Sequence, residues 1–224
     1  MIPWKQLDST DIPNDGGLLH LHQRDDEFSI RIGNCELMNS RAHGSEEKLA
    51  ELGCAGLGTT ERPRVLVGGL GMGFTAAAAL NHLGVDASLE VAELLPAVVR
   101  WNREYLGHLA GYPLKDPRTL IREIDVAAII KTSTQRFDAI LLDVDNGPDG
   151  LTQKENDWLY SNAGLKTAYQ ALKAGGTLAV WSATPSAAFT TRLRKAGYKV
   201  REEQTSARGK GKGGRHTIWL ASRS

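Results

Sequence analysis

The chain has 224 residues, of which 41% are hydrophobic and 24% charged, and its formal net charge is +1. This is enough chain for one large domain with a full core, and the net charge points to no particular partner. The sequence excludes a transmembrane helix, which needs about 18 consecutive apolar residues, and we expect a cytoplasmic protein because the start lacks a signal-peptide pattern and Cys35 and Cys54 make no disulfide framework.

Residues 1–60 differ in pattern from the rest and predict a small β-rich segment. Residues 1–61 hold five Lys/Arg against eleven Asp/Glu, a local net charge of −6 that suits a cationic substrate or a solvated surface. His20–Arg24 and Phe28–Ile32 alternate around turn residues and predict a hairpin. Ser45–Leu52 predicts a short helix that Ser45 caps, with Glu46 and Glu47 in its first turn.

From Arg64 onward, strand patterns alternate with helix patterns. The predicted strands are Arg64–Val67, Ala87–Ala92, Thr119–Arg122, Phe137–Leu142, Thr177–Trp181, Tyr198–Glu203 and His216–Ala221. The predicted helices are Phe74–Leu83, Leu95–Leu106, Val126–Thr132, Glu155–Leu172 and Ser186–Ala196. Such alternation predicts a parallel sheet with helices on both faces. The last two strands predict an antiparallel hairpin, which is typical of methyltransferases. The fold class is therefore α/β, a Rossmann-like methyltransferase fold with a mostly parallel seven-stranded sheet over residues 61–224.

The first candidate site is the turn Gly68-Gly69-Leu70-Gly71-Met72-Gly73, which follows a predicted strand and opens a predicted helix. Glycines allow a tight turn and a close approach of backbone to ligand, so we expect a nucleoside-type cofactor beside Gly69, Gly71, Met72 and Gly73. Glu93 ends the next strand, where a carboxylate can accept both hydroxyls of a ribose. Glu90 is an alternative, although it lies inside the strand.

Acidic residues also follow the third and fourth strands. Asp125 is a candidate for binding the exocyclic amine of adenine, and equally a candidate helix N-cap. Asp143 lies where a substrate would meet the cofactor, because ligands of open parallel sheets bind beyond the carboxyl ends of the strands. Asp143 can act as general base for an attacking amine, and Asp145 can bind the cationic form of that amine.

Three aromatic residues complete the predicted site. Trp158, Tyr160 and Trp181 are candidates for the substrate lining, with packing in the core or between helices as the competing interpretation. The basic stretch Arg208–Arg215 predicts a surface hairpin loop, and we do not expect nucleic acid as a partner. Histidines and cysteines show no metal-ligand spacing, so no metal is expected.

Together these residues resemble the spermidine synthase family. The resemblance rests on Val65–Gly73, Glu93, Asp125 and Phe137–Asp143. It implies a methyltransferase-like fold after a small N-terminal sheet, a homodimer, and transfer of the aminopropyl group of decarboxylated S-adenosylmethionine to a small-molecule amine. On this basis the glycines line the cofactor site, Glu93 holds the ribose, Asp125 contacts the adenine and Asp143 is the base.

The sequence departs from the family pattern at two places. Met72 stands where the family's glycine turn usually has an aspartate, and the loop after Asp143 is shorter. Both differences fall on groups that recognise amines. A methyltransferase that uses intact S-adenosylmethionine is therefore an alternative, because Met72 leaves no carboxylate to oppose that of the methionine. A non-catalytic nucleoside-binding module is another alternative, and a nicotinamide dehydrogenase a weaker one.

Overall fold

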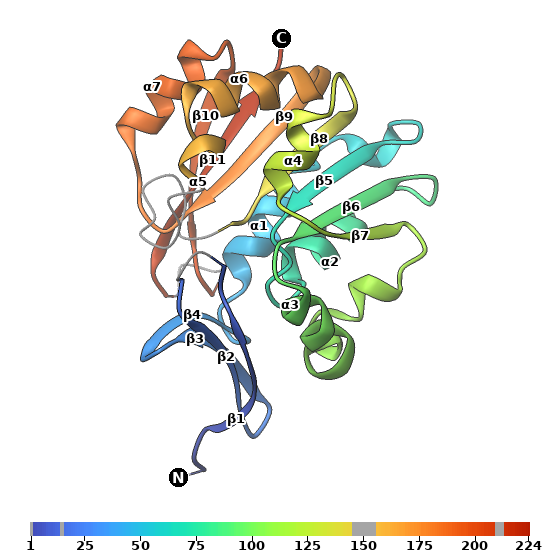
Figure 1. Cartoon of the computed structure of the whole chain (residues 1–224). Helices are drawn as coiled ribbons and strands as arrows, with labels where there is room; N and C mark the ends of the chain where they lie inside the picture. The colour runs from blue at the N-terminus through green and yellow to red at the C-terminus, as the bar shows by residue number, and fades with distance from the viewer. Residues whose placement is uncertain (1, 14–15, 145–155, 209–212) are drawn as a thin grey trace.

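The computed structural model describes residues 2–13, 16–144, 156–208 and 213–224, which form two sheets (Figure 1). The larger sheet has the strand order β10-β11-β9-β8-β5-β6-β7. Neighbouring strands are parallel, except that β11 is antiparallel to both β9 and β10. The strands are β5 (Arg64–Gly68), β6 (Ser88–Glu93), β7 (Thr119–Glu123), β8 (Phe137–Leu142), β9 (Leu172–Ser182), β10 (Lys199–Ser206) and β11 (Arg215–Ser222). The predicted fold class is confirmed.

Helices cover both faces of the large sheet. Val65 and Val67 of β5 face a core shared with α1 (Gly44–Gly53), α2 (Phe74–Asn81) and α3 (Pro96–Trp101). Leu66 faces the opposite core, which includes α4 (Val126–Lys131), α6 (Asn162–Ala171) and α7 (Ala187–Lys195). A strand buried on both faces must be apolar throughout, which accounts for the sequence of β5. None of the helices in the described ranges is long and apolar enough to cross a membrane.

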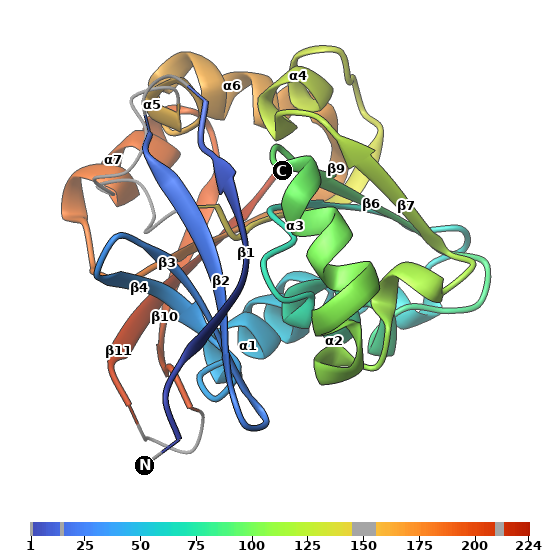
Figure 2. The ribbon, with the colours of Figure 1, turned by 60° about the horizontal axis from the view of Figure 1, so that its bottom comes forward.

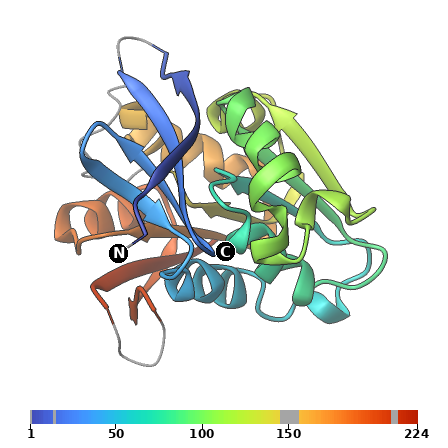
Figure 3. The ribbon, with the colours of Figure 1, turned by 90° about the horizontal axis from the view of Figure 1, so that it is seen from below.

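The smaller sheet is antiparallel, with its strands in sequence order. It consists of β1 (Lys5–Asp11), β2 (Leu18–Arg24), β3 (Glu27–Ile32) and β4 (Cys35–Asn39). Its apolar face, with Leu21 and Ile30, joins the core that contains α1, α2 and α3. Seen from below, the small sheet lies in front of the large one (Figures 2 and 3). The hairpin predicted near the N-terminus is thus part of a four-stranded sheet whose outer strands were not predicted.

Three predicted helices differ from the observed ones. The helix at residues 44–53 begins at Gly44 after His43, and Ser45 does not cap it. The helix predicted over Leu95–Leu106 is α3 followed by a π-helical turn at Asn102–Leu106. The single helix predicted over Glu155–Leu172 is wrong, because α5 (Asn156–Leu159) and α6 are separate. Short 3₁₀ turns occur at Leu57–Thr59, Gly107–Ala110 and Pro113–Lys115.

The break between α5 and α6 and the early start of β9 have local causes. Ser161 Oγ accepts a hydrogen bond from Gly164 N at 3.1 Å, and so starts α6 as its N-cap. A Cβ at Gly164 would lie 2.1 Å from the carbonyl oxygen of Trp158, so this close turn needs glycine. At the other end, the fully buried Leu172 pairs with Phe137 of β8, so the strand begins before the predicted Thr177.

Asp8 connects the small sheet to α3. Its Oδ2 accepts hydrogen bonds from Arg100 Nη2 at 2.6 Å and from Trp101 Nε1 at 2.7 Å. The bond from Arg100, followed by that from Trp101, lowers the pKa of Asp8, so the carboxylate stays ionised. Trp101 is fully buried, and its N–H therefore depends on this acceptor.

We expect Asp8→Ala to lower the free energy of unfolding by about 1–3 kcal/mol, because it leaves the buried N–H of Trp101 without an acceptor. Arg100→Ala is the matched control, since it removes only a partly exposed ion pair and should cost roughly 0–1 kcal/mol. Urea denaturation of both variants at pH 7 measures the difference. Equal losses of unfolding free energy in the two variants would show that the ion pair with Arg100, rather than the bond from Trp101, stabilises the contact between the small sheet and α3.

Candidate functional site

The turn Gly68–Gly73 joins β5 to α2 where the strand order reverses. From β5 the chain continues through β6 on one side, while β8 lies on the other. Gly69, Gly71 and Gly73 have φ angles of +89°, +51° and +87°, in the region that favours glycine. Gly69 is also limited by space, because a Cβ there would lie 2.4 Å from the carbonyl oxygen of Asp143. The turn therefore needs glycine both for its course and for its approach to the end of β8.

Glu93 holds this turn in place from the end of β6. Its Oε2 accepts a hydrogen bond from Leu70 N and its Oε1 one from Leu95 N, each at 2.9 Å. Burial raises the pKa of Glu93, while these backbone bonds act in the opposite direction. Glu90 is instead paired with Arg136 at 2.5 Å and with Arg122 at 3.3 Å. Of the two glutamates weighed for ribose binding, Glu93 lines a cavity beside the glycine turn, and Glu90 is not among the described residues of that lining.

That cavity has a volume of about 160 Å³ and lies between the small sheet and the strand ends of the large one. We call it the apolar cavity, because the small sheet contributes only hydrophobic side chains to it. Its lining on the large-sheet side includes Gly69, Gly71, Glu93, Asp125 and Asp143. The structure thus brings together most of the residues predicted to bind a cofactor.

Asp125 has a structural role in addition to its place on this cavity. Its Oδ1 accepts a hydrogen bond from Ala127 N at 2.8 Å and caps α4. The N-cap interpretation is therefore confirmed. Contact with an adenine remains a prediction that the position of Asp125 allows.

A second cavity, of about 380 Å³, lies on the α1 and β11 side of the glycine turn. We call it the acidic cavity, because its described titratable residues are Glu36, Glu46, Asp143 and His216. Met72 and Trp181 also line it. Asp143 borders both cavities, as do Gly71, Leu37 and Met38. The two cavities therefore meet at Asp143, the residue predicted from the sequence to be a general base.

The carboxylate of Asp143 is held by α2 and by the turn. Thr75 Oγ1 donates a hydrogen bond to Asp143 Oδ2 at 2.6 Å, and the backbone N–H of Asp143 donates to Gly68 O at 3.0 Å. Burial raises the pKa of Asp143 to about 6, with the bond from Thr75 opposing the shift. A carboxylate with such a pKa is a stronger base than an ordinary aspartate and is still ionised at pH 7.

Glu46 is one of the residues of the candidate site that the sequence did not predict. It is half-buried on α1, and burial followed by the charge of Asp143 raises its pKa to about 7. Two carboxylates that interact in this way share protons and titrate as a pair. Glu46 was assigned to the first turn of a helix, where an acidic residue needs no further explanation. Nothing in the linear pattern placed it opposite Asp143.

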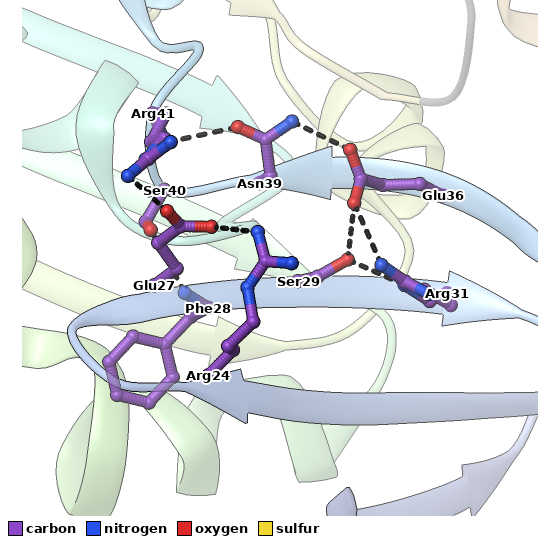
Figure 4. A network of polar contacts seen from close by, with 9 residues as sticks. All are labelled: Arg24, Glu27, Phe28, Ser29, Arg31, Glu36, Asn39, Ser40 and Arg41. Atoms are coloured by element: carbon purple, nitrogen blue, oxygen red, sulfur yellow. Dashed lines mark hydrogen bonds and ion pairs between the residues drawn. The ribbon is translucent and has the colours of Figure 1, made fainter. Parts of the chain in front are cut away.

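Glu36 is the third carboxylate of the acidic cavity, but a polar network on the small sheet engages it (Figure 4). Its Oε2 accepts from Ser29 Oγ at 2.8 Å and from Arg31 Nη2 at 3.3 Å, and its Oε1 accepts from Asn39 Nδ2 at 2.7 Å. Burial alone would raise the pKa of Glu36, but these hydrogen bonds outweigh it and lower the pKa. Glu36 therefore stays ionised and helps to hold β4 in position. Residues of β4 line both cavities.

Tyr160 and Trp158 pack outside the two cavities. Tyr160 is buried against Phe189 and its hydroxyl donates to Val144 O at 3.3 Å, while the ring of Trp158 is covered by Lys131 Nζ at 4.1 Å. Neither is among the described residues that line the two cavities, so their contact with a substrate stays a prediction. Asp145 lies outside the described residues.

Met72 lies in the glycine turn, and Asn102 contacts the turn from outside. Met72 is buried, with 3% of its surface exposed, and contributes only apolar surface to the acidic cavity. Asn102 was not predicted, yet its Nδ2 donates to Gly71 O at 2.8 Å and so fixes the turn from the α3 side. An asparagine within a helix pattern gives no sequence signal for such a role.

Comparisons with known proteins agree with this fold. No family model and no curated protein matches the sequence. Among solved structures, spermidine synthase from Thermotoga maritima is 18% identical with a TM-score of 0.76, and the match covers 98% of this chain and 73% of that one. A spermidine synthase in complex with the transition state analogue AdoDATO is 18% identical, with a TM-score of 0.75 and coverage of 98% and 72%. A probable spermidine synthase from Corynebacterium glutamicum is 14% identical, with a TM-score of 0.69 and coverage of 98% and 80%. The fold that the sequence resemblance implied is therefore confirmed.

We expect Gly69→Ala to destabilise the protein by about 1–3 kcal/mol, because it combines a disfavoured φ with a clash against backbone that cannot rotate away. Gly71→Ala is the matched control. Its Cβ would meet the flexible side chain of Met38, 3.1 Å from Sδ, and we expect a smaller loss. Thermal or urea unfolding measures both. A larger loss for Gly71→Ala would contradict the proposed contact between the turn and β8.

We expect Glu46→Gln to raise the melting temperature at pH 8 more than at pH 5. A carboxylate whose pKa is raised by folding contributes most stability at acidic pH, and this is lost as the pH rises through the folded value of about 7. An amide has no such loss. Glu47→Gln changes the exposed neighbour and serves as the control. A gain for Glu46→Gln that is the same at both pH values would show that its ionisation does not oppose folding.

Proposed function

We propose that this chain transfers an alkyl group, in the first place an aminopropyl group, from an S-adenosylmethionine-type sulfonium to an amine. One observation carries the proposal: Asp143 stands at the junction of an apolar cavity and an acidic one. The apolar cavity suits the nucleoside half of a donor, and the acidic cavity suits a cationic acceptor. The solved structures of similar fold are described as spermidine synthases, which supports the same assignment.

The donor would occupy the apolar cavity between the small sheet and the glycine turn. Glu93 is the carboxylate available to ribose hydroxyls, and Asp125 is available to an adenine amine. The cavity of about 160 Å³ is smaller than the ~300–1,000 Å³ typical of small-molecule sites. We therefore expect a donor to displace flexible side chains of the wall, of which Met38 lies against the glycine turn.

The chemistry requires one proton acceptor and correct orientation. Asp143 first takes one proton from the ammonium form of the acceptor, which leaves the nitrogen with a free lone pair. The neutral nitrogen then attacks the carbon next to sulfur, a C–N bond forms, and the C–S bond breaks with its electron pair going to sulfur. Positioning and this proton transfer are the contributions that the chain's own residues can make.

The position of Glu46 favours aminopropyl over methyl transfer. Met72 supplies no carboxylate to the acidic cavity, but Glu46 lines the same cavity and supplies one. Two acidic side chains there attract an ammonium group and oppose the carboxylate of intact S-adenosylmethionine. Because Glu46 supplies the carboxylate that Met72 lacks, Met72 no longer favours a methyltransferase.

We expect the protein to release methylthioadenosine when it is incubated with decarboxylated S-adenosylmethionine and a panel of primary amines and diamines. Mass spectrometry identifies both the nucleoside and the alkylated amine. Asp143→Asn should lower kcat about 100-fold or more, because it removes the base. Release of S-adenosylhomocysteine from intact S-adenosylmethionine would assign methyl transfer instead.

Calorimetry provides the control for this experiment. Asp143→Asn should bind methylthioadenosine as the wild type does, because the proposed ribose and adenine contacts are those of Glu93 and Asp125 and the asparagine keeps the shape of the cavity wall. Glu46→Gln should reduce the preference for the decarboxylated donor over the intact one. Indifference of the wild type to all three nucleosides would overturn the proposed function, and would leave no support for a nucleoside-binding module.

A further inference from the structure

A hydrogen-bonded chain leads away from the carboxylate pair of the acidic cavity. Ser45 Oγ bonds to Glu46 Oε2 at 2.6 Å and to His216 Nδ1 at 3.0 Å. Ser45 and Glu46 lie at the start of α1, while His216 lies on β11. Gly44 N donates to Ala207 O at 2.8 Å, which ties the start of α1 to the end of β10. The contact therefore joins two distant segments that the fold holds together.

The buried hydroxyl of Ser45 can conduct a proton in one step. A hydroxyl donates one hydrogen bond and accepts others. When Glu46 is ionised, His216 donates to Ser45 and Ser45 donates to Glu46. When Glu46 is protonated, it donates to Ser45 and Ser45 donates to His216. The two arrangements differ by the transfer of one proton from Glu46 to Ser45 and of another from Ser45 to His216.

Few charged groups surround Glu46, Ser45 and His216 among the described residues. Asp143 lines the same cavity as Glu46, and its charge acts on Glu46. Glu36 of β4 is held by hydrogen bonds of its own, and the exposed Glu47 follows on α1. Thr75 and Phe74 of α2 carry no charge. Burial lowers the pKa of His216, whose ring packs edge-on against Trp181 with centroids 4.7 Å apart. A neutral imidazole is therefore available as an acceptor at neutral pH.

We propose that Glu46, Ser45 and His216 form the outlet for the proton that Asp143 takes from the attacking amine. The inference rests on the proposed function. Asp143 passes the proton to its partner Glu46, the O–H bond of Glu46 breaks as Ser45 is protonated, and the O–H bond of Ser45 breaks as the N–H bond at His216 Nδ1 forms. The imidazolium then releases one proton to solvent and becomes neutral. One proton enters from the amine and one leaves, and no other bond changes.

The carboxylate pair needs a route by which it can lose a proton after each turnover. A pair that holds one proton at neutral pH must lose the second one before the next turnover, because two protonated carboxyls cannot act as a base. Ser45 is 1% exposed, so the hydroxyl itself cannot exchange freely with bulk water. His216 is half-buried and belongs to the edge of the cavity where β11 begins. It is the described titratable group best placed to pass the proton outward.

The experiment uses four variants of the 224-residue chain, of which the last is a control. Ser45→Ala breaks the hydrogen-bonded chain and should lower kcat by about 10-fold to 100-fold, which is at or below the ~100-fold lower end for a group that exchanges a proton with the substrate directly, with KM for donor and amine unchanged. Ser45→Thr keeps the hydroxyl and should restore kcat. His216→Ala should show the same fall as Ser45→Ala, but added imidazole should restore its rate, as small bases do where the lost group only exchanges protons with solvent. His43→Gln, which removes a histidine paired with Glu47 outside this chain, should leave kcat unchanged.

A second measurement needs no turnover. Nitrogen NMR of the His216 ring in the ligand-free protein should show a titration and tautomer that change in Ser45→Ala and in Glu46→Gln. If the ring is indifferent to both, the outlet is refuted even if the protein is an active transferase. If the wild type transfers no alkyl group, the proposed function fails. The NMR titration still shows whether the protonation of Glu46 and that of His216 are coupled through Ser45. Wild-type kcat and pH profile in Ser45→Ala would also overturn the outlet.

Discussion

The turn between β5 and α2 keeps its shape because the ends of both neighbouring strands bond to it. Gly69 N donates to Ala92 O at 2.9 Å on the β6 side, and Asp143 N donates to Gly68 O at 3.0 Å on the β8 side. Glu93 adds a buried carboxylate under the backbone of the turn. One hydrogen-bonded unit thus sets the distance between the carboxylates of Glu93 and Asp143. A shift of the turn would move both, so the binding and the chemistry proposed for them depend on the same contacts.

Much of this unit could be predicted from the sequence, because its parts are local. A buried parallel strand must be apolar, a tight turn of positive φ favours glycine, and a polar residue at a strand end lies at the ligand edge of the sheet. Gly69, Glu93 and Asp143 each satisfied one of these rules. The rules also exposed Glu90 as the weaker choice, since a residue inside a strand is held by that strand's neighbours, here Arg136 and Arg122.

The features that the sequence did not show depend on contacts between distant segments. Glu46 and Asp143 meet only because α1 packs beside β8, and Ser45 meets His216 only because α1 also touches β11. The linear pattern explained Ser45 as a cap, which was wrong, because the hydroxyl is committed to a tertiary contact instead. The long predicted helix failed for a similar reason: Ser161 and Gly164 allow a sharp turn that lets α5 and α6 pack separately.

The acidic cavity shows that a binding site must supply charge at a place in space rather than at a place in the sequence. Met72 leaves the glycine turn without a carboxylate, and Glu46 brings one to the same cavity from α1. Because burial raises the pKa values of both Glu46 and Asp143, and the charge of Asp143 raises that of Glu46 further, the pair holds a proton that a bound cation would expel. Cation binding and proton release are then reciprocal, each favouring the other. In the proposed outlet, the reciprocal linkage sets how tightly an ammonium group binds, and the polar contacts of Ser45 set how fast the expelled proton leaves.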